Sequence, residues 1–112
     1  MNLEDLQSFC KKLDNVTEDI KWGHDICFNI SGKMFLVANP DGMSVSASFK
    51  TDEETFNELI EKDGIIPAPY LARHKWVYVD DINRLSKKDW QQHIVNSYEL
   101  VKAKLSKNKR LN

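Results

Sequence analysis

One stretch of the chain, residues 67–79, brings together more side chains capable of polar chemistry than any other segment of similar length. It holds one imidazole, two cations and three large aromatic rings: His74, Arg73, Lys75, Tyr70, Trp76 and Tyr78. Cations bind phosphate groups whatever the base sequence, and aromatic rings stack on bases. One interpretation of these residue types is therefore a nucleic-acid-binding surface. The alternative is structural, with the aromatics packed under a helix and the cations solvated at the edge of a sheet.

Two further lysines are predicted to extend this surface. Lys33 follows the turn of an expected hairpin, and Lys50 ends an expected strand. The predicted nucleic-acid-binding residues are Arg73, Lys75, Lys33, Lys50, Tyr70 and His74.

The sequence contains no recognisable catalytic motif. It has neither G-x-x-x-x-G-K-[ST] nor G-x-G-x-x-G, and the alternating serines of residues 44–48 lack the nucleophile elbow of a hydrolase. The three histidines lie far apart without the paired spacing of zinc ligands; we expect His24 to be fixed by Asp25 in a loop and His93 to lie on the exposed side of the last helix. We therefore expect no catalytic residue, no metal site and no cofactor: the protein is predicted not to be an enzyme.

Length and composition predict one domain over residues 1–112. The chain has a mass of 13.0 kDa, with 41% hydrophobic and 29% charged residues, which is typical of a globular protein with its own core. No apolar run approaches the roughly 18 residues of a membrane span, and Met1 leads into an acidic helix start. We expect a cytoplasmic monomer without membrane contact, in which Cys10 and Cys27 are buried free thiols.

The net charge of −1 hides an uneven distribution. Residues 1–65 hold six cations against thirteen carboxylates, a net of −7, whereas residues 66–112 hold ten against four, a net of +6. The acidic half would repel DNA unless it faces away from it. We expect the cations of residues 102–110 to solvate the end of a helix rather than to form a separate binding arm.

Hydrophobic periodicity predicts the order helix, three strands, helix, strand, helix. Asn2 is expected to cap the first helix and Thr51 the second, and residues 16–20 are ambiguous. Residues 43–49 alternate as a strand, and the last helix carries an apolar stripe: Trp90, Ile94, Tyr98, Val101 and Leu105. The predicted fold is α+β, a two-layer sandwich with an antiparallel sheet of about four to five strands and helices on one face.

Several segments together resemble the MmcQ/YjbR family. They are the acidic first helix, Trp22-Gly23-His24-Asp25, Ser31-Gly32-Lys33-Met34-Phe35, Phe49-Lys50, Pro67-Ala68-Pro69-Tyr70-Leu71-Ala72-Arg73-His74-Lys75-Trp76-Val77 and Ser97-Tyr98-Glu99-Leu100-Val101. The resemblance covers nearly the whole chain. It implies a fold similar to the CyaY-like (frataxin-like) sandwich and a role in DNA binding through a double-wing surface of sheet and projecting loops.

The chain departs from the family at one segment. Many members carry H-x-N-K-x-H-W-N-T where residues 70–78 stand here, so the Asn and Thr donors are missing and any role of theirs is not carried over. Non-enzymatic DNA binding is the leading hypothesis, with DNA as partner. The alternative is a module that binds another protein or a small ligand. A third hypothesis, metal handling, rests on fold similarity alone and would use carboxylates near the N-terminus: Glu4, Asp5, Asp14, Glu18 and Asp19.

Overall fold

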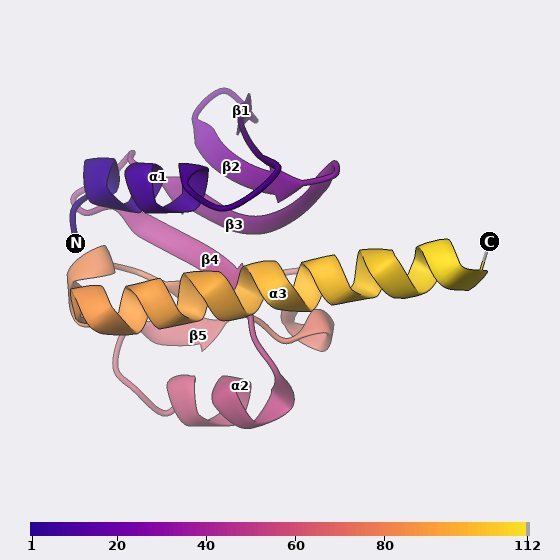
Figure 1. Cartoon of the computed structure of the whole chain (residues 1–112). Helices are drawn as coiled ribbons and strands as arrows, with labels where there is room; N and C mark the ends of the chain where they lie inside the picture. The colour runs from indigo at the N-terminus through magenta and orange to yellow at the C-terminus, as the bar shows by residue number, and fades with distance from the viewer. Residues whose placement is uncertain (112) are drawn as a thin grey trace.

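The fold is a twisted antiparallel sheet covered by helices (Figure 1). The computed structural model describes the backbone of residues 1–111 and the side chains of residues 1–105. The strands, in spatial order, are β1 (Val16–Lys21), β2 (Asp25–Ile30), β3 (Lys33–Asn39), β4 (Ser46–Lys50), β6 (Trp76–Val79) and β5 (Ile65–Pro67). The helices are α1 (Leu3–Lys11), α2 (Glu53–Leu59) and α3 (Lys87–Leu111), with two short 3-10 helices, η1 (Ala72–His74) and η2 (Ile82–Arg84).

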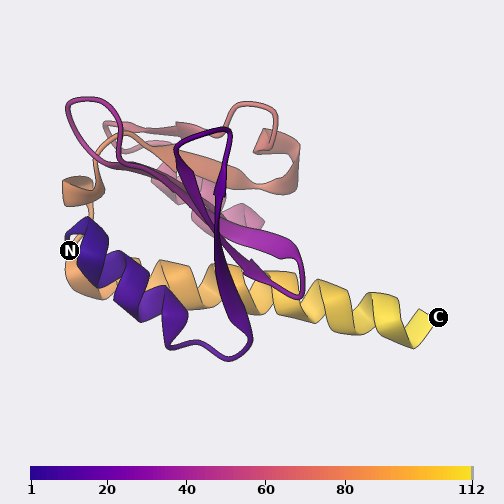
Figure 2. The same ribbon diagram turned by 90° about the horizontal axis from the view of Figure 1, so that it is seen from above.

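The helices share one hydrophobic core with one face of the sheet. Figure 2 shows α1 and α3 on the same side of the sheet, and α2 packs against β5 and β6. The predicted apolar stripe of α3 is confirmed, because Trp90 and Ile94 are fully buried and only Leu105, at its end, is partly exposed. Both cysteines are buried free thiols, as predicted, and burial raises the pKa of Cys10 to about 12. The predicted α+β sandwich is therefore correct.

The sheet has six strands, more than the four to five predicted. One addition is β1, the segment that periodicity left ambiguous; it is an edge strand with mostly exposed side chains, so it lacks the alternation of a half-buried strand. The other is β5, whose three residues pair with β6 between α2 and the proline-rich segment. A segment this short carries no periodic signal.

The segment before β4 differs from the prediction that residues 43–49 form one strand. Strand pairing begins at Ser46, and Met43 is fully exposed in the β3–β4 loop. Ser44 Oγ donates a hydrogen bond to the carbonyl oxygen of Asp80 (3.0 Å), and the carbonyl oxygen of Val45 accepts one from the N–H of Ile82 (2.8 Å). These bonds join the loop to the segment that holds η2 instead of to β3.

Three segments that lie apart in the sequence meet at one end of the sheet. The β2–β3 turn has positive φ at Ser31 (48°) and Gly32 (80°), the geometry of a tight hairpin turn, and it places Lys33 at the start of β3. η1 ends at His74, and the next residue, Lys75, has a φ of 64° that turns the chain into β6. The C-terminal half of α3 extends past the body of the molecule on the same side (Figure 1). None of the described helices has an apolar stretch long enough to span a membrane.

Candidate anion-binding cleft

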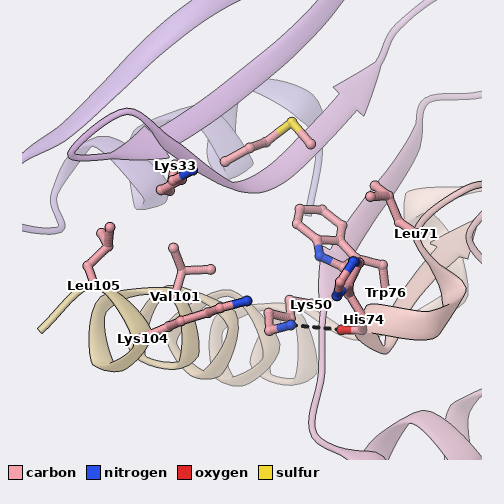
Figure 3. Close-up of a pocket in the computed structure, with 9 residues that line it drawn as sticks. Lys33, Lys50, Leu71, His74, Trp76, Val101, Lys104 and Leu105 are labelled. Carbon is pink, nitrogen blue, oxygen red and sulfur yellow. Dashed lines mark hydrogen bonds between the residues drawn. The ribbon is translucent and has the colours of Figure 1, made fainter. Parts of the chain in front are cut away.

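A cleft of about 360 Å³ lies where the β2–β3 hairpin, η1 and α3 meet (Figure 3). Its lining residues are Lys33, Met34, Lys50, Leu71, His74, Trp76, Val101, Lys104 and Leu105. Among these described residues there are three lysines and one histidine, and no carboxylate. The polar side chains of the cleft are therefore almost exclusively hydrogen-bond donors, which suits an anion.

Lys50, the last residue of β4, is held in place from two directions. Its Nζ donates a hydrogen bond to the carbonyl oxygen of His74 (2.8 Å), and its backbone N–H donates to the Oγ of Ser97 in α3 (3.0 Å). Burial, followed by repulsion from Lys104, lowers the pKa of the Lys50 ammonium. Of the side chains that the structure describes in the cleft none is a carboxylate, so the partner of this ammonium is a carbonyl, which does not neutralise its positive charge.

His74 and Trp76 form the wall on the side of η1 and β6. Figure 3 shows the Trp76 indole nitrogen turned toward the side of the cleft where Lys50 lies. Trp76 is only 5% exposed, so its ring contributes an edge to the cleft instead of a free stacking face. Desolvation, followed by repulsion from Arg73, Lys50 and Lys104, lowers the pKa of His74, so the imidazole is neutral at pH 7.

The rest of the lining is apolar. Met34 from β3, Leu71 from the segment before η1, and Val101 and Leu105 from α3 face the cleft. Apolar walls with a few convergent polar groups are typical of a ligand site.

The structure brings together three of the six predicted binding residues and separates the others. Lys33, Lys50 and His74 line the cleft, and Arg73 is exposed beside His74. Lys75 is directed toward α2, where its Nζ lies 5.1 Å from the centre of the Phe56 ring and 3.9 Å from Glu53. Tyr70 is fully exposed and is not among the residues that line the cleft.

Two functional candidates were not among the predicted binding residues. Trp76 was grouped with the aromatics of the central stretch but given no role. Lys104 is among the cations expected to solvate the end of the last helix, but it lines the cleft and lies three residues after Val101, at the border of the apolar stripe. Its position next to the stripe was the available signal. The side chains of Lys107, Lys109 and Arg110, which belong to the same prediction, lie outside the described residues.

The other histidines are held away from the cleft. His24 Nδ1 lies 3.2 Å from Asp41 and its Nε2 lies 3.9 Å from Asp25, so a second carboxylate joins the predicted partner. His93 is half-buried, contrary to the prediction that it is exposed, because its ring stacks on that of Phe49 in β4. Among residues 1–105, no three His, Cys, Asp or Glu side chains gather in a way that would hold a metal ion.

The fold defines the class of protein: a two-layer α+β sandwich in which a six-stranded antiparallel sheet is backed by helices. The chain belongs to the YjbR family, because the YjbR family model matches residues 11–100. This confirms the family that the sequence segments indicated.

Two solved structures share this fold. A Deinococcus radiodurans protein described as domain DUF419 has a TM-score of 0.80 and 22% sequence identity, and the match covers 89% of this chain and 78% of that chain. A protein from Pseudomonas syringae has a TM-score of 0.73 and 22% identity, covering 89% of this chain and 98% of that chain. No curated protein matches the chain.

Proposed function

We propose that this chain is a non-enzymatic DNA-binding protein of the YjbR family, and that DNA phosphates bind at the cleft. The supporting observation is the convergence of Lys33, Lys50 and Lys104 from three separate segments on a cleft whose described lining residues include no carboxylate. Arg73, exposed beside His74, extends the positive surface. The surface consists of the end of the sheet, a hairpin turn and a loop, which agrees with the sheet-and-loop mode that the family resemblance implies.

The proposal assigns different roles to the residues of the central stretch. His74, which lines the cleft, and Arg73, which is exposed and precedes it in the chain, are assigned contacts with the phosphate backbone. Lys75 is instead engaged with Phe56 and Glu53 on α2, so it is assigned a structural role.

Binding of a labelled duplex, measured by fluorescence anisotropy at roughly 50 and 200 mM salt, tests the proposal. The informative variant is Lys33→Gln/Lys104→Gln, because both side chains are exposed and line the cleft. The matched control is Lys87→Gln/Lys88→Gln, two exposed lysines at the other end of α3, about 24 Å away along the helix.

We expect the control to bind only slightly more weakly than the wild-type protein in low salt, and both to lose affinity at least tenfold over this salt range because counterions are released on binding. The cleft variant should bind more weakly at both salt concentrations. The proposal is wrong if the folded wild-type protein shows no binding at micromolar concentration in low salt, or if the cleft and control variants bind alike.

A second candidate function is the binding of a small anionic ligand. It is favoured by the concave form of the site and by the apolar walls of Met34, Leu71 and Val101, which a contact made only with the phosphate backbone does not need. Isothermal titration with a mononucleotide and with the matching nucleoside tests this candidate. A mononucleotide that binds, in a protein that does not bind DNA, would favour the small ligand.

A further inference from the structure

The cations of the cleft surround a single cavity instead of lying in a row along a groove. Lys33 comes from the hairpin, Lys50 from the end of β4 and Lys104 from α3, and all three line the same cleft of about 360 Å³. This volume is near the lower limit for ligand pockets, which begin at about 300 Å³. One phosphate with part of its nucleotide fills it, whereas a run of backbone phosphates would need cations spread along a groove.

The donors of the cleft exceed what an internal phosphodiester can use. A diester carries one negative charge on two non-bridging oxygens, while a phosphomonoester carries up to two charges on three oxygens. Three lysines line the cleft and the Trp76 indole N–H faces it (Figure 3). Because no carboxylate among the described lining residues balances Lys50 and Lys104, a dianion matches the site better than a single charge.

The apolar part of the lining indicates that more than a phosphate enters. Leu71 lies beside Trp76 on one side of the cleft, Met34 lines it from β3, and Val101 and Leu105 form the side contributed by α3. An internal nucleotide must have chain leaving on both sides, whereas a terminal nucleotide needs only one exit and can place its sugar against these walls.

We propose that the cleft binds the terminal phosphomonoester of a nucleic acid strand in preference to internal phosphodiesters. This rests on the proposed function, since it names which part of a DNA molecule the site takes. The 5′ and the 3′ phosphate offer the same chemistry, so both belong in the test.

The test uses one internally labelled duplex in four forms, with binding measured by anisotropy. The ends carry 5′-phosphates, 3′-phosphates or hydroxyls only, and in the fourth form both ends are closed by hairpin loops. We expect one of the phosphorylated forms to bind at least about tenfold more tightly than the hydroxyl and closed forms, the value of one additional charge-assisted hydrogen bond. This preference should disappear in Lys33→Gln/Lys104→Gln and persist in Lys87→Gln/Lys88→Gln.

The outcomes separate this proposal from the proposed function. Equal binding of all four forms overturns the preference for ends but leaves DNA binding intact. If the cleft variant keeps the preference for phosphorylated ends, the terminal phosphate binds outside the cleft, and this result also overturns the proposal. Absence of binding by every form overturns both proposals.

Discussion

At the scale of single residues, Ser97 links the core to the cleft. It is fully buried in α3, and its Oγ donates a hydrogen bond to the carbonyl oxygen of Phe35 (2.6 Å) while accepting one from the N–H of Lys50 (3.0 Å). The register of β2 and β3 shifts between Phe28 and Asn29, which leaves Phe35 of β3 without a partner residue in β2. The carbonyl oxygen of Phe35 therefore accepts its hydrogen bond from Ser97 in α3. The Ser97 hydroxyl thereby fixes the distance between α3 and the end of β4, where Lys50 lies.

Replacing Ser97 with alanine should therefore destabilise the protein. Both Phe35 and Lys50 would lose a buried partner, so we expect the free energy of unfolding to fall by about 1–3 kcal/mol, measured by urea denaturation. Ser8→Ala, an exposed position in α1, serves as control and should change stability by no more than about 0.5 kcal/mol. Equal effects of the two substitutions would contradict the bridging role.

His93 makes stability depend on pH. Its ring stacks on Phe49 with centroids 5.3 Å apart, and burial is the largest cause that lowers its pKa below 6.5. Among its charged neighbours, Lys62 acts in the same direction and Asp89 and Asp52 oppose it. The unfolded chain thus takes up a proton at higher pH than the folded chain. The contribution of the neutral His93 to stability is fully present above the pKa of this residue in the unfolded chain. It is lost as pH falls through the lower pKa of the folded chain.

Urea denaturation as a function of pH checks this dependence. We expect the wild-type midpoint to fall as pH drops below 6.5, and the His93→Gln variant to lose less stability over the same interval. The difference between the two curves isolates His93 from other groups. Parallel curves would mean that His93 titrates alike in the folded and unfolded states.

At the scale of elements, the residue predicted to cap α2 instead makes a hydrogen bond to a segment distant in the sequence. The predicted cap, Thr51, donates its Oγ hydrogen to the carbonyl oxygen of Lys75 (2.7 Å) and so joins the end of β4 to the turn after η1. Asp52 caps the helix instead, accepting a hydrogen bond from the N–H of Thr55 (2.8 Å). This bond lowers the pKa of the Asp52 carboxyl.

Removal of this cap should weaken α2. We expect Asp52→Ala to lower the free energy of unfolding by about 1 kcal/mol, whereas Asp52→Asn retains the acceptor and most of the stability. Chemical denaturation of the two variants measures the difference. If Asn and Ala cost the same, the side chain at this position is not acting as a cap.

Local patterns predicted most of the elements but not the cleft. The apolar stripe of α3 and the Ser31-Gly32 turn are encoded by neighbouring residues, so they were predictable. β1 was not, because an exposed edge strand has no alternating pattern. The cleft depends on the meeting of a hairpin, a 3-10 turn and a helix that lie apart in the sequence. Two non-glycine residues with positive φ, Tyr70 (67°) and Lys75 (64°), turn the chain on either side of η1, and no local pattern predicts them.

At the scale of the whole molecule, the uneven charge distribution bears on DNA binding. Acidic side chains lie at both ends of α2, and all of them are exposed. They are Asp52, Glu53 and Glu54 at its start and Glu58 and Glu61 at its end. In contrast, the charged side chains among the described residues that line the cleft are the three lysines, Lys33, Lys50 and Lys104. Because screening in salt limits the reach of exposed charges to about 10 Å at 0.1 M, the acidic residues that do not contact DNA should affect approach more than binding.

The salt dependence of DNA affinity measures how many cations make contact. If Lys33, Lys50, Lys104 and Arg73 each neutralise one phosphate charge, the logarithm of affinity should fall against the logarithm of salt with a slope of about −3 to −4. Removing Lys33 and Lys104 together should reduce the magnitude of the slope by about 2.

The acidic side of the molecule supplies the complementary test. Glu58→Gln/Glu61→Gln changes the net charge by the same amount as the lysine pair but in the opposite sense, at residues that do not line the cleft. We expect this variant to bind slightly more tightly in low salt with an unchanged slope, because no counterion release at a contact is altered. A slope that changes as much in this variant as in Lys33→Gln/Lys104→Gln would mean that total charge, and not the cleft, governs the interaction.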